Sequence, residues 1–480
     1  MLKMIKDPIH DFVEFRGEYE NDLLSKVVSD PFFQRLRRIK QLGFSDYVFP
    51  SATHSRFSHS LGVYSVAKMM LSVKEPGAVE AGRWSKEGKQ CLAAALLHDV
   101  GHGMFSHSFE KAMEFFFARN PEYQKKFPNL KAAVNHEKIS ERIIKESSMH
   151  EVLEGIGGNG FSHGVSDLIE KKNKNCIYTS IVSGQLDADR LDYAKRDSYF
   201  AGIASGGIDL GWLIRNLKVN SGQEGEFFYA DSKAYVSLEQ FAVTLFQLYP
   251  NIYFHKKTRG LEYMFSLLMC HVFELIAQGD LDSLGLAIDH PFVVFFKDPS
   301  DINNSLFLDD ATFLGSLYLF INSKNSFIST LARRILERRI YPLIDVWEIA
   351  EGLAGYNKKF YDLDAQKRLI IINNLCNGVR QEIANTEDWN ESNYYDFYSR
   401  PIYKKINNTG GHPQQINVKI GSDFFDISSV SPIIGSEASF SIHRIYYDDS
   451  IEGYGEKLRE IIEGLMSGKL TDYLNTISSS

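Results

Sequence analysis

The feature that most constrains this chain is a polar cluster at the end of an apolar run. Residues 91–97 are almost entirely alanine and leucine, which predicts a helix buried on all sides. Gly101 and Gly103 follow, and we expect them to end the helix as C-terminal glycines do. The ten residues after the run hold three imidazoles and one carboxylate: His98, Asp99, His102 and His107. These polar side chains therefore emerge from inside the core.

A buried histidine and aspartate need partners, because burying an unpaired polar group or charge costs several kcal/mol. A divalent cation satisfies both, since neutral imidazole nitrogen and ionised carboxylate are good ligands. Two other stretches supply more such groups: 55–64 brings His59 into the first turns of a predicted helix, and 186–193 brings three acids into another. The candidate ligand set is His59, His98, Asp99 and one of Asp187 or Asp189.

The order of these ligands along the chain resembles that of the HD-domain phosphohydrolases. Within that family it is most similar to the deoxynucleoside triphosphate triphosphohydrolases. Further motifs carry the same resemblance over about the first 270 residues: Asp7-Pro8-Ile9-His10, Phe33-Gln34-Arg35-Leu36-Arg37, Lys40-Gln41-Leu42-Gly43, Val48-Phe49-Pro50 and Tyr253-Phe254-His255-Lys256.

The resemblance implies a mainly α fold with an HD-domain helical core. We expect that core, with an N-terminal strand or turn, over residues 1–270, and a smaller α+β region over 271–480. By motif order the fourth ligand is Asp189. The implied cofactor is a divalent ion, Mn, Mg, Fe, Ni or Zn, and the implied activity is hydrolysis of nucleotides by metal-activated water. A homo-oligomer is also implied.

Departure of an alkoxide from phosphorus needs a proton donor, and His107 stands three residues before Glu110, which can orient its imidazole. We therefore expect this pair to act as the catalytic acid. By resemblance, His102 and His136 hydrogen-bond phosphate oxygens. Arg190, next to Asp189, would neutralise developing charge.

For the nucleoside end, the resemblance places Gln41 and Leu42 near the sugar, and Tyr193 and Asp197 at the 3′-hydroxyl. It also places Tyr253 where it would stack near the sugar or base, and Arg56 over the site. His54 and His255 are interpreted as structural.

Composition limits the partners of this 480-residue chain. Its formal net charge of −8 gives no reason to expect nucleic-acid binding, and no apolar run approaches the roughly 20 residues of a membrane span. The N-terminus lacks the apolar core of a signal peptide, and the four cysteines show no paired spacing. We expect a nucleotide as substrate, no membrane partner and a reducing cytoplasm.

Two regions outside the ligand motifs leave their roles open. Residues 21–42 are predicted helical, and their basic residues, Arg35, Arg37, Arg38 and Lys40, either form a solvated face or contact phosphate. Segments 311–322 and 327–353 are predicted helices, whereas 416–420, 424–427 and 439–447 are predicted strands.

Other functions compete with triphosphate hydrolysis. Leu245 and Pro250 stand where similar triphosphohydrolases carry basic residues, which favours a phosphodiesterase or nucleotidase acting on smaller or cyclic substrates. A non-catalytic nucleotide sensor with a structural metal is a third hypothesis. The simplest alternative is a polar core in which the histidines and aspartates satisfy one another.

Overall fold

The computed structural model describes residues 2–204, 207–223, 225–406, 409–436 and 439–478, and the chain divides into two compact units. Unit 1 consists of Met1–Arg338 and Ile402–Ala438, and unit 2 of Arg339–Pro401 and Ser439–Ser480. The predicted boundary after residue 270 falls inside a helix of unit 1. The chain therefore leaves unit 1 after Arg338, later than expected, and residues 402–438 belong to unit 1 again.

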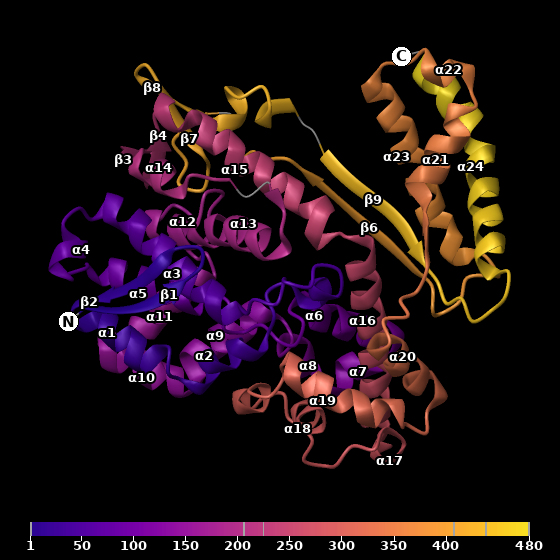
Figure 1. Cartoon of the computed structure of the whole chain (residues 1–480), viewed down its shortest axis with the longest axis horizontal. Helices are drawn as coiled ribbons and strands as arrows, with labels where there is room; N and C mark the ends of the chain where they lie inside the picture. Colours follow the sequence, from indigo (N-terminus) through magenta and orange to yellow (C-terminus); the bar gives the residue numbers. More distant parts are fainter. Residues whose placement is uncertain (1, 205–206, 224, 407–408, 437–438, 479–480) are drawn as a thin grey trace. The chain divides into compact units, whose positions relative to one another are not determined.

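Unit 1 is mainly helical (Figure 1). Its helices are α1 (Gly17–Asp22), α2 (Pro31–Arg35), α3 (Arg56–Lys74), α4 (Ala78–Ala81), α5 (Lys86–Leu97), α6 (His107–Arg119), α7 (Pro121–Lys126), α8 (Pro128–Ala132), α9 (His136–Glu146), α10 (Ser148–Gly157), α11 (Phe161–Ile169), α12 (Ile177–Ser183), α13 (Ala188–Ala201), α14 (Leu210–Arg215), α15 (Tyr235–Leu248), α16 (Lys256–Gln278), α17 (Leu281–Leu284), α18 (Pro291–Lys297), α19 (Asp310–Ile321) and α20 (Ser326–Leu336).

The core of unit 1 forms around α3, α5 and α13. Every residue from Cys91 to Leu97 is fully buried, as the alanine and leucine run predicts, because α5 packs against α3 on one side and α11 on another. Helix α13 lies along α3. The ligand-bearing ends of these three helices are therefore fixed by apolar packing.

The glycines in the turn after α5 are there for a different physical reason from the one expected. Gly101 and Gly103 are absent from the positive-φ residues of the described chain, so they do not end the helix in a left-handed conformation. A Cβ on Gly101 would lie 2.2 Å from the carbonyl oxygen of His136 and 2.4 Å from the amide nitrogen of Ser140. The glycine is required because the turn presses against the first residues of α9.

The N-terminal segment forms a hairpin, β1 (Leu2–Asp7) and β2 (Asp11–Arg16), in which Asp7 pairs with Asp11. The helix predicted over residues 21–42 is broken into short pieces: α1, the π-helix η1 (Leu23–Val27), α2 and the 3-10 helix η2 (Leu36–Arg38). The break has a clear cause, since Asp30 caps α2 with its side chain and Pro31 occupies the first helical position.

Unit 1 also contains a four-stranded sheet, seen beside α12 and α14 in Figure 1. Its order is β3-β4-β7-β8, with strands β3 (Leu217–Gly222), β4 (Gly225–Ala230), β7 (Asn417–Ile420) and β8 (Asp423–Asp426). Strands β7 and β8 fall where strands are predicted. The parallel pairing of β4 with β7 brings the 402–438 segment back to unit 1, and the Asn417 amide reinforces it by donating to the carbonyl oxygen of Phe228 at 3.1 Å.

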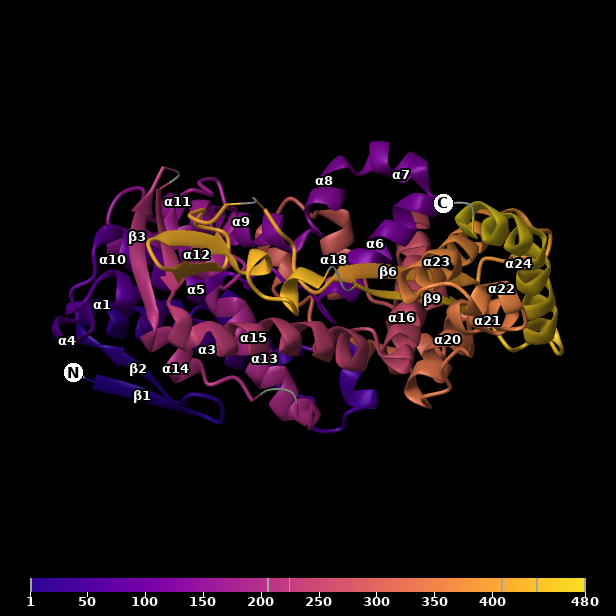
Figure 2. The same ribbon diagram turned by 90° about the horizontal axis from the view of Figure 1, so that it is seen from above.

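Unit 2 is a small α+β unit, coloured orange to yellow in Figure 2. Its antiparallel sheet has the order β5-β9-β6, with β5 (Leu343–Asp345), β6 (Tyr394–Pro401) and β9 (Ser439–Tyr446). The helices are α21 (Val346–Gly355), α22 (Lys358–Tyr361), α23 (Ala365–Glu382) and α24 (Tyr454–Ser478). The predicted fold class, mainly α with a smaller α+β C-terminal region, is confirmed. The helix expected over 327–353 is interrupted by β5.

Helix α16 is the one described helix whose length and composition would allow it to cross a membrane. From the sequence, no apolar run of this length was predicted. However, 72% of its most apolar window is buried within the protein, where it packs against α6 and α20. This burial is typical of a core helix.

Candidate active site

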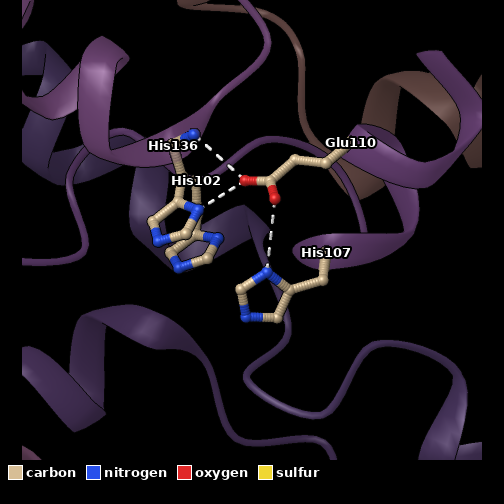
Figure 3. A group of neighbouring side chains, drawn as sticks. All are labelled: His102, His107, Glu110 and His136. Atoms are coloured by element: carbon tan, nitrogen blue, oxygen red, sulfur yellow. Dashed lines mark hydrogen bonds and ion pairs between the residues drawn. The ribbon is translucent and has the colours of Figure 1, made fainter. Parts of the chain in front are cut away.

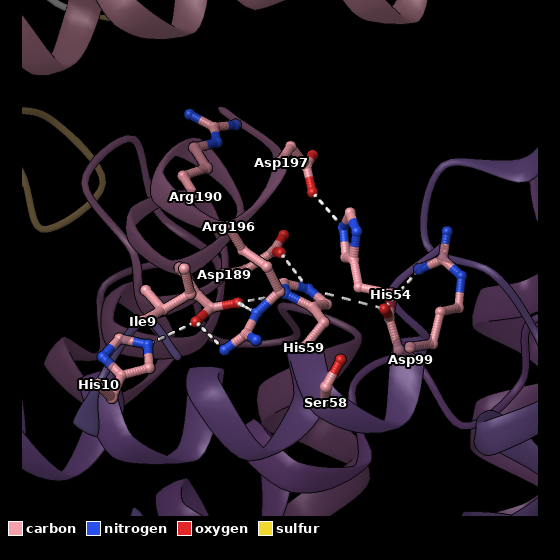
Figure 4. Close-up of polar contacts among 12 residues, drawn as sticks. Ile9, His10, His54, Ser58, His59, Asp99, Asp189, Arg190, Arg196 and Asp197 are labelled. Atoms are coloured by element: carbon pink, nitrogen blue, oxygen red, sulfur yellow. Dashed lines mark hydrogen bonds and ion pairs between the residues drawn. The ribbon is translucent and has the colours of Figure 1, made fainter. Parts of the chain in front are cut away.

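Three side chains from three helices converge at the centre of unit 1. His59 lies in the first turns of α3, His98 follows the last residue of α5, and Asp189 lies in the first turn of α13. One ligand atom from each lies within 4.8 Å of the others, and the Nε2 atom of His59 is 3.0 Å from Asp189 Oδ1. The segments are separated by 39 to 130 residues in sequence, and packing brings them together. Figure 4 shows His59 beside Asp189.

Asp187 and Asp189 have different environments. Asp187 is the N-cap of α13, and its Oδ1 accepts a 2.7 Å hydrogen bond from the Arg190 amide. The Asp187 carboxylate therefore caps the N-terminus of α13. Asp189 faces His59 and His98, in agreement with the ligand that motif order favours.

Asp99 lies at the edge of this cluster, with Oδ2 3.7 Å from His59 Nε2 and Oδ1 3.4 Å from His98 Nε2. The guanidinium of Arg56 forms a close ion pair with Asp99 Oδ2, and Arg56 Nε donates to Ser106 Oγ at 2.8 Å. Arg56, predicted to lie over the site, contacts the predicted metal ligand Asp99.

The electrostatics of the cluster favour a cation. Burial opposes a charge on His59, but hydrogen bonds to Asp189 and Asp192 outweigh it and raise the pKa of His59 to about 10. Despite burial, the charge of Arg56 holds the pKa of Asp99 well below its usual range, and the hydrogen bond with His59 lowers that of Asp189. The carboxylates here thus stabilise positive charge.

His98 shows most directly that the residues fit a metal ion. Its Nδ1–H donates to the carbonyl oxygen of Ala95 at 2.9 Å, which leaves a lone pair on Nε2. That Nε2 atom is buried and has no hydrogen-bond partner among the residues that the structure describes. It lies 3.8 Å from Asp189 Oδ1. A divalent metal site is consistent with this donor set of imidazole nitrogen and carboxylate oxygen.

A second group adjoins the first and contains His102, His107, Glu110 and His136, whose ligand atoms also lie within 4.8 Å of one another (Figure 3). His102 connects the two groups. Its Nε2 is 3.3 Å from Asp99 Oδ1, and its ring stacks on that of His136 with centroids 4.2 Å apart. The predicted catalytic side chains are therefore brought together beside the predicted ligands.

Glu110 contacts two of these imidazoles rather than one. Its Oε2 lies 3.5 Å from His107 Nδ1, and its Oε1 accepts from the Nδ1 of His136 in a close contact and from the His136 amide at 3.0 Å. Burial would raise the pKa of Glu110, but both imidazoles hold it well below its usual range. The sequence indicated only the contact with His107, because 26 residues separate Glu110 from His136.

Three of the predicted nucleoside contacts meet around one carboxylate. Tyr253 donates to Asp197 Oδ2 at 2.7 Å, and the rings of Tyr193 and Tyr253 meet edge to face. His54, interpreted as structural from sequence, contributes Nε2 at 2.9 Å from Asp197 Oδ1. The signal that could have identified His54 is its position two residues before Arg56, in the loop that leads to His59.

Gln41 and Leu42 lie beside this group because their segment pairs with the loop that holds His54. The amide of Gln41 donates to the carbonyl oxygen of His54 at 2.9 Å. The Gln41 Oε1 atom is buried and has no hydrogen-bond partner within the described part of the chain, and Leu42 is also buried. Gln41 therefore retains an acceptor for a further polar group.

Arg190, predicted to neutralise developing charge, has its described hydrogen bonds and ion pairs with residues other than His59, His98 and Asp189. Its guanidinium donates to Gln185 Oε1 at 2.9 Å and lies 3.7 Å from Asp187 Oδ2. Figure 4 shows the side chain directed away from His59. The order of residues on α13 explains this, because a helix turns neighbouring side chains to different faces.

The basic residues between 35 and 40 differ in exposure: Arg35 is buried, Lys40 is half-buried, and Arg37 and Arg38 are exposed. Arg35 is buried and donates to three carbonyl oxygens, those of Val100, His102 and Ser305. The others have local partners: Arg37 lies over the Phe57 ring, Arg38 pairs with Asp309, and Lys40 pairs with Asp46.

Comparisons with known proteins agree with this site. The HD domain family model matches residues 56–194, a range that contains His59, His98, Asp99 and Asp189. The uncharacterized protein YwfO of Bacillus subtilis is 32% identical over 348 residues, which cover 72% of this chain and 72% of that protein. The chain belongs to the HD-domain phosphohydrolase family.

Two further relatives extend the comparison. The deoxynucleoside triphosphate triphosphohydrolase SAMHD1 of Bos taurus is 34% identical over 228 residues, covering 42% of this chain and only 36% of that protein. The crystal structure of a hypothetical protein from Aquifex aeolicus superposes with a TM-score of 0.64 at 25% identity, covering 97% of this chain and all of the other. The similarity to that solved fold therefore extends over nearly the whole chain.

Proposed function

We propose that this protein hydrolyses deoxynucleoside triphosphates to a deoxynucleoside and tripolyphosphate, with a divalent metal ion held by His59, His98, Asp99 and Asp189. The observation that carries the proposal is the double contact of His102, to Asp99 on one side and to His136 on the other. Because of this contact, groups suited to a cation and groups suited to phosphate lie next to each other. The name of the bovine relative supports the substrate class.

A divalent ion bound there supplies Lewis acidity, which polarises a phosphoryl oxygen and makes water a better nucleophile near neutral pH. We expect the water oxygen to attack the α-phosphorus and the bond from that phosphorus to the 5′ oxygen to break. The 5′ oxygen then takes a proton from the His107 imidazolium, which Glu110 orients. His136 would donate to a phosphate oxygen from Nε2, because Glu110 accepts from its Nδ1. His102, whose ring stacks on that of His136, would lie against the same phosphate.

The sugar would bind at Asp197. Tyr253 and His54 both contact this carboxylate, one at each oxygen, which fixes its orientation. An ionised carboxylate has about four acceptor positions, so it can still accept from a 3′-hydroxyl. Leu42 and Gln41 would contact the other side of the sugar.

The test is a panel of substrates. The purified protein, stripped of metal and reloaded with Mn²⁺ or Mg²⁺, would be incubated with the four deoxynucleoside triphosphates, ATP, dAMP and cyclic AMP, and products separated by chromatography. We expect deoxynucleoside and tripolyphosphate from the triphosphates, and none from Asp189→Asn. Asp167→Asn, which changes a half-exposed aspartate on α11, is the matched control. No turnover of any nucleotide by the wild type contradicts the proposal.

A nucleotidase or phosphodiesterase is the second candidate, and one observation favours it. Leu245 is buried in α15, and Pro250 lies in the π-helix η6 (Tyr249–Tyr253). Because both side chains are uncharged, neither supplies the positive charge that a γ-phosphate would need. The same panel separates the two functions. This second function requires products from dAMP or cyclic AMP and intact triphosphates.

We also propose a homo-oligomer in the cytoplasm. The support for the compartment is that all four cysteines are free, three of them buried. Light scattering of the purified protein tests the first statement, and fractionation of the native host cells tests the second. A monomeric mass, or recovery outside the cytoplasm, contradicts them.

A further inference from the structure

Asp192 is the most completely bonded carboxylate in the described part of the site. Its Oδ2 accepts from His59 Nδ1 at 2.8 Å and from Arg196 Nε at 2.8 Å. Its Oδ1 accepts from His10 Nε2 at 2.5 Å and from an Arg196 amino group at 3.0 Å. These four bonds use the acceptor positions of a carboxylate, and Asp192 is fully buried. It therefore has little freedom to rotate.

The N-terminal hairpin supplies one of these four bonds. His10 lies in the turn between β1 and β2, and its side chain is 4% exposed. Asp7 shapes this turn, because its Oδ1 accepts from the amides of Ile9 at 2.9 Å and His10 at 3.0 Å. Asp7 also binds Arg196, whose amino group donates to Asp7 Oδ2 at 2.9 Å. The hairpin turn and α13 are thus joined through the carboxylates of Asp7 and Asp192 and the guanidinium of Arg196. Figure 4 shows His10 and Arg196 on either side of this contact.

Gly62 on α3 leaves room for this arrangement. A Cβ at that position would lie 2.0 Å from Asp192 Oδ1 and 2.4 Å from the Arg196 guanidinium. Any larger residue at position 62 would push Asp192 away from His59, one turn earlier on the same helix. The glycine is needed for close approach, since its φ is not in the left-handed region.

We infer that Asp192 and His10 are positioning residues of the metal site, and that the N-terminal hairpin is part of that site. The inference rests on His59 being a ligand, as the proposed function requires. With its Nδ1–H donated to Asp192, His59 directs Nε2 toward Asp189 and His98, and loss of the Nε2 proton makes a lone pair available there for a metal ion. His10 and Arg196 act on the metal only through Asp192.

The energetic consequence is in metal affinity. Loss of such an outer hydrogen-bond partner typically weakens metal binding by about 10- to 100-fold, because the imidazole is no longer held in one tautomer and orientation. The hairpin contributes only the His10 bond, while Arg196 still holds Asp192. We therefore expect the lower part of that range for changes at His10 and the upper part for changes at Asp192.

The variants at position 10 remove or keep the N–H donor to Asp192 while the volume of the side chain changes little. His10→Phe fills the same space but removes the donor to Asp192, whereas His10→Gln keeps an N–H donor. Lys6→Ala is the matched control in the same hairpin, because the described contacts of the Lys6 side chain are with exposed Asp11 and the Phe12 ring. Asp192→Asn keeps one acceptor oxygen at the other end of the contact but replaces the second with an amide group, which cannot accept from His59, His10 or Arg196.

The measurements are the Kd for Mn²⁺ by titration calorimetry and the visible spectrum of the Co²⁺ form. We expect His10→Phe to raise the Kd about 10-fold and to alter the Co²⁺ spectrum, and Asp192→Asn to raise the Kd about 100-fold. His10→Gln should stay within about 3-fold of the wild type, and Lys6→Ala should match it. A His10→Phe protein with a lower Tm but an unchanged Kd overturns the inference, because it assigns His10 a structural role only.

A further measurement tests the tautomer of His59 directly. Nitrogen-15 NMR of the histidine side chains of the metal-loaded wild type should show His59 protonated at Nδ1 and not at Nε2, with the signal assigned through His59→Gln. The opposite tautomer, or a wild type that binds no divalent ion, overturns the inference. If metal binding follows these expectations but no nucleotide is hydrolysed, the proposed function fails and the inference stands.

Discussion

Arg35 donates a 2.6 Å hydrogen bond to the carbonyl oxygen of His102, and through it α2 holds the turn that carries His98 and Asp99. The same guanidinium donates to Val100 at 2.9 Å and to Ser305 at 2.8 Å. Burial lowers the pKa of Arg35 to about 10, yet it remains charged at neutral pH. A buried cation thus replaces the backbone partners that this irregular turn lacks.

Arg35→Met should lower the free energy of unfolding by about 3 kcal/mol, because three buried carbonyl oxygens lose a charged donor. Urea denaturation measures the change. Arg37→Met is the control, since Arg37 is exposed and lies over the Phe57 ring; its loss should cost about 0.5 to 1 kcal/mol. Equal effects of the two changes would contradict the clamping role of Arg35.

Metal binding should stabilise the protein through His98. At Mn²⁺ concentrations near 100 times the Kd, we expect the wild type to gain about 2.7 kcal/mol, seen as a rise in Tm that EDTA reverses. His98→Ala should lose most of this gain, because its buried Nε2 has no hydrogen-bond partner among the described residues and so is available to a metal ion. Exposed His163→Ala is the control and should gain as the wild type does. An equal rise in His98→Ala would exclude His98 as a ligand.

The group around Glu110 should affect turnover and leave metal binding intact. Glu110→Gln should lower kcat by about 100-fold or more, since loss of an oriented general acid costs about 10² to 10⁴ in rate. The Mn²⁺ affinity should change little, because the described polar contacts of the Glu110 carboxylate are with His107 and His136, not with the four proposed ligands. Glu114→Gln, one turn further along α6 and exposed, is the matched control. A parallel loss of metal would show that both clusters form one metal site.

His54 should govern affinity for the sugar. His54→Ala should raise the KM for a deoxynucleoside triphosphate about 10-fold, because Asp197 loses one of its two fixed partners and turns away from the 3′-hydroxyl. Steady-state kinetics measures this, and calorimetry should find the Mn²⁺ affinity unchanged. A KM equal to the wild type would return His54 to the structural role that its sequence context indicated.

Asp310 should make stability depend on pH. Burial raises its pKa to about 7, although its oxygens accept from the amides of Lys40 at 2.9 Å and Phe105 at 2.7 Å. The unfolded carboxyl titrates near 3.9, so between these values the folded state binds more protons and its stability falls as pH rises. The stability that the protonated form contributes is fully present below pH of about 4 and lost above about 7, a difference of up to about 4 kcal/mol.

The check on Asp310 is urea denaturation of the wild type and Asp310→Asn at several pH values between 5 and 8. The amide does not titrate, so the wild type should lose stability relative to the variant as pH rises through this range. A difference that is constant with pH would show that Asp310 stays ionised when folded.

The sequence by itself determined the fold class and the set of chemical groups. The apolar run before His98 could only be a buried helix, and histidines and acids placed at the ends of such helices had to meet partners in the core. The spacing of His107 and Glu110 within one helical turn likewise indicated their contact. These features depend on local periodicity, which can be read along the chain.

The tertiary structure decided the partners of groups that lie far apart in sequence. Arg56 binds Asp99, Glu110 binds His136, and His54 binds Asp197, across separations of 26 to 143 residues. Side-chain direction also decided roles: Arg190 follows Asp189 in sequence but turns to another face of α13. How the helices pack determines which charged groups pair with each other. Packing joins distant segments, and their order along the chain does not indicate these contacts.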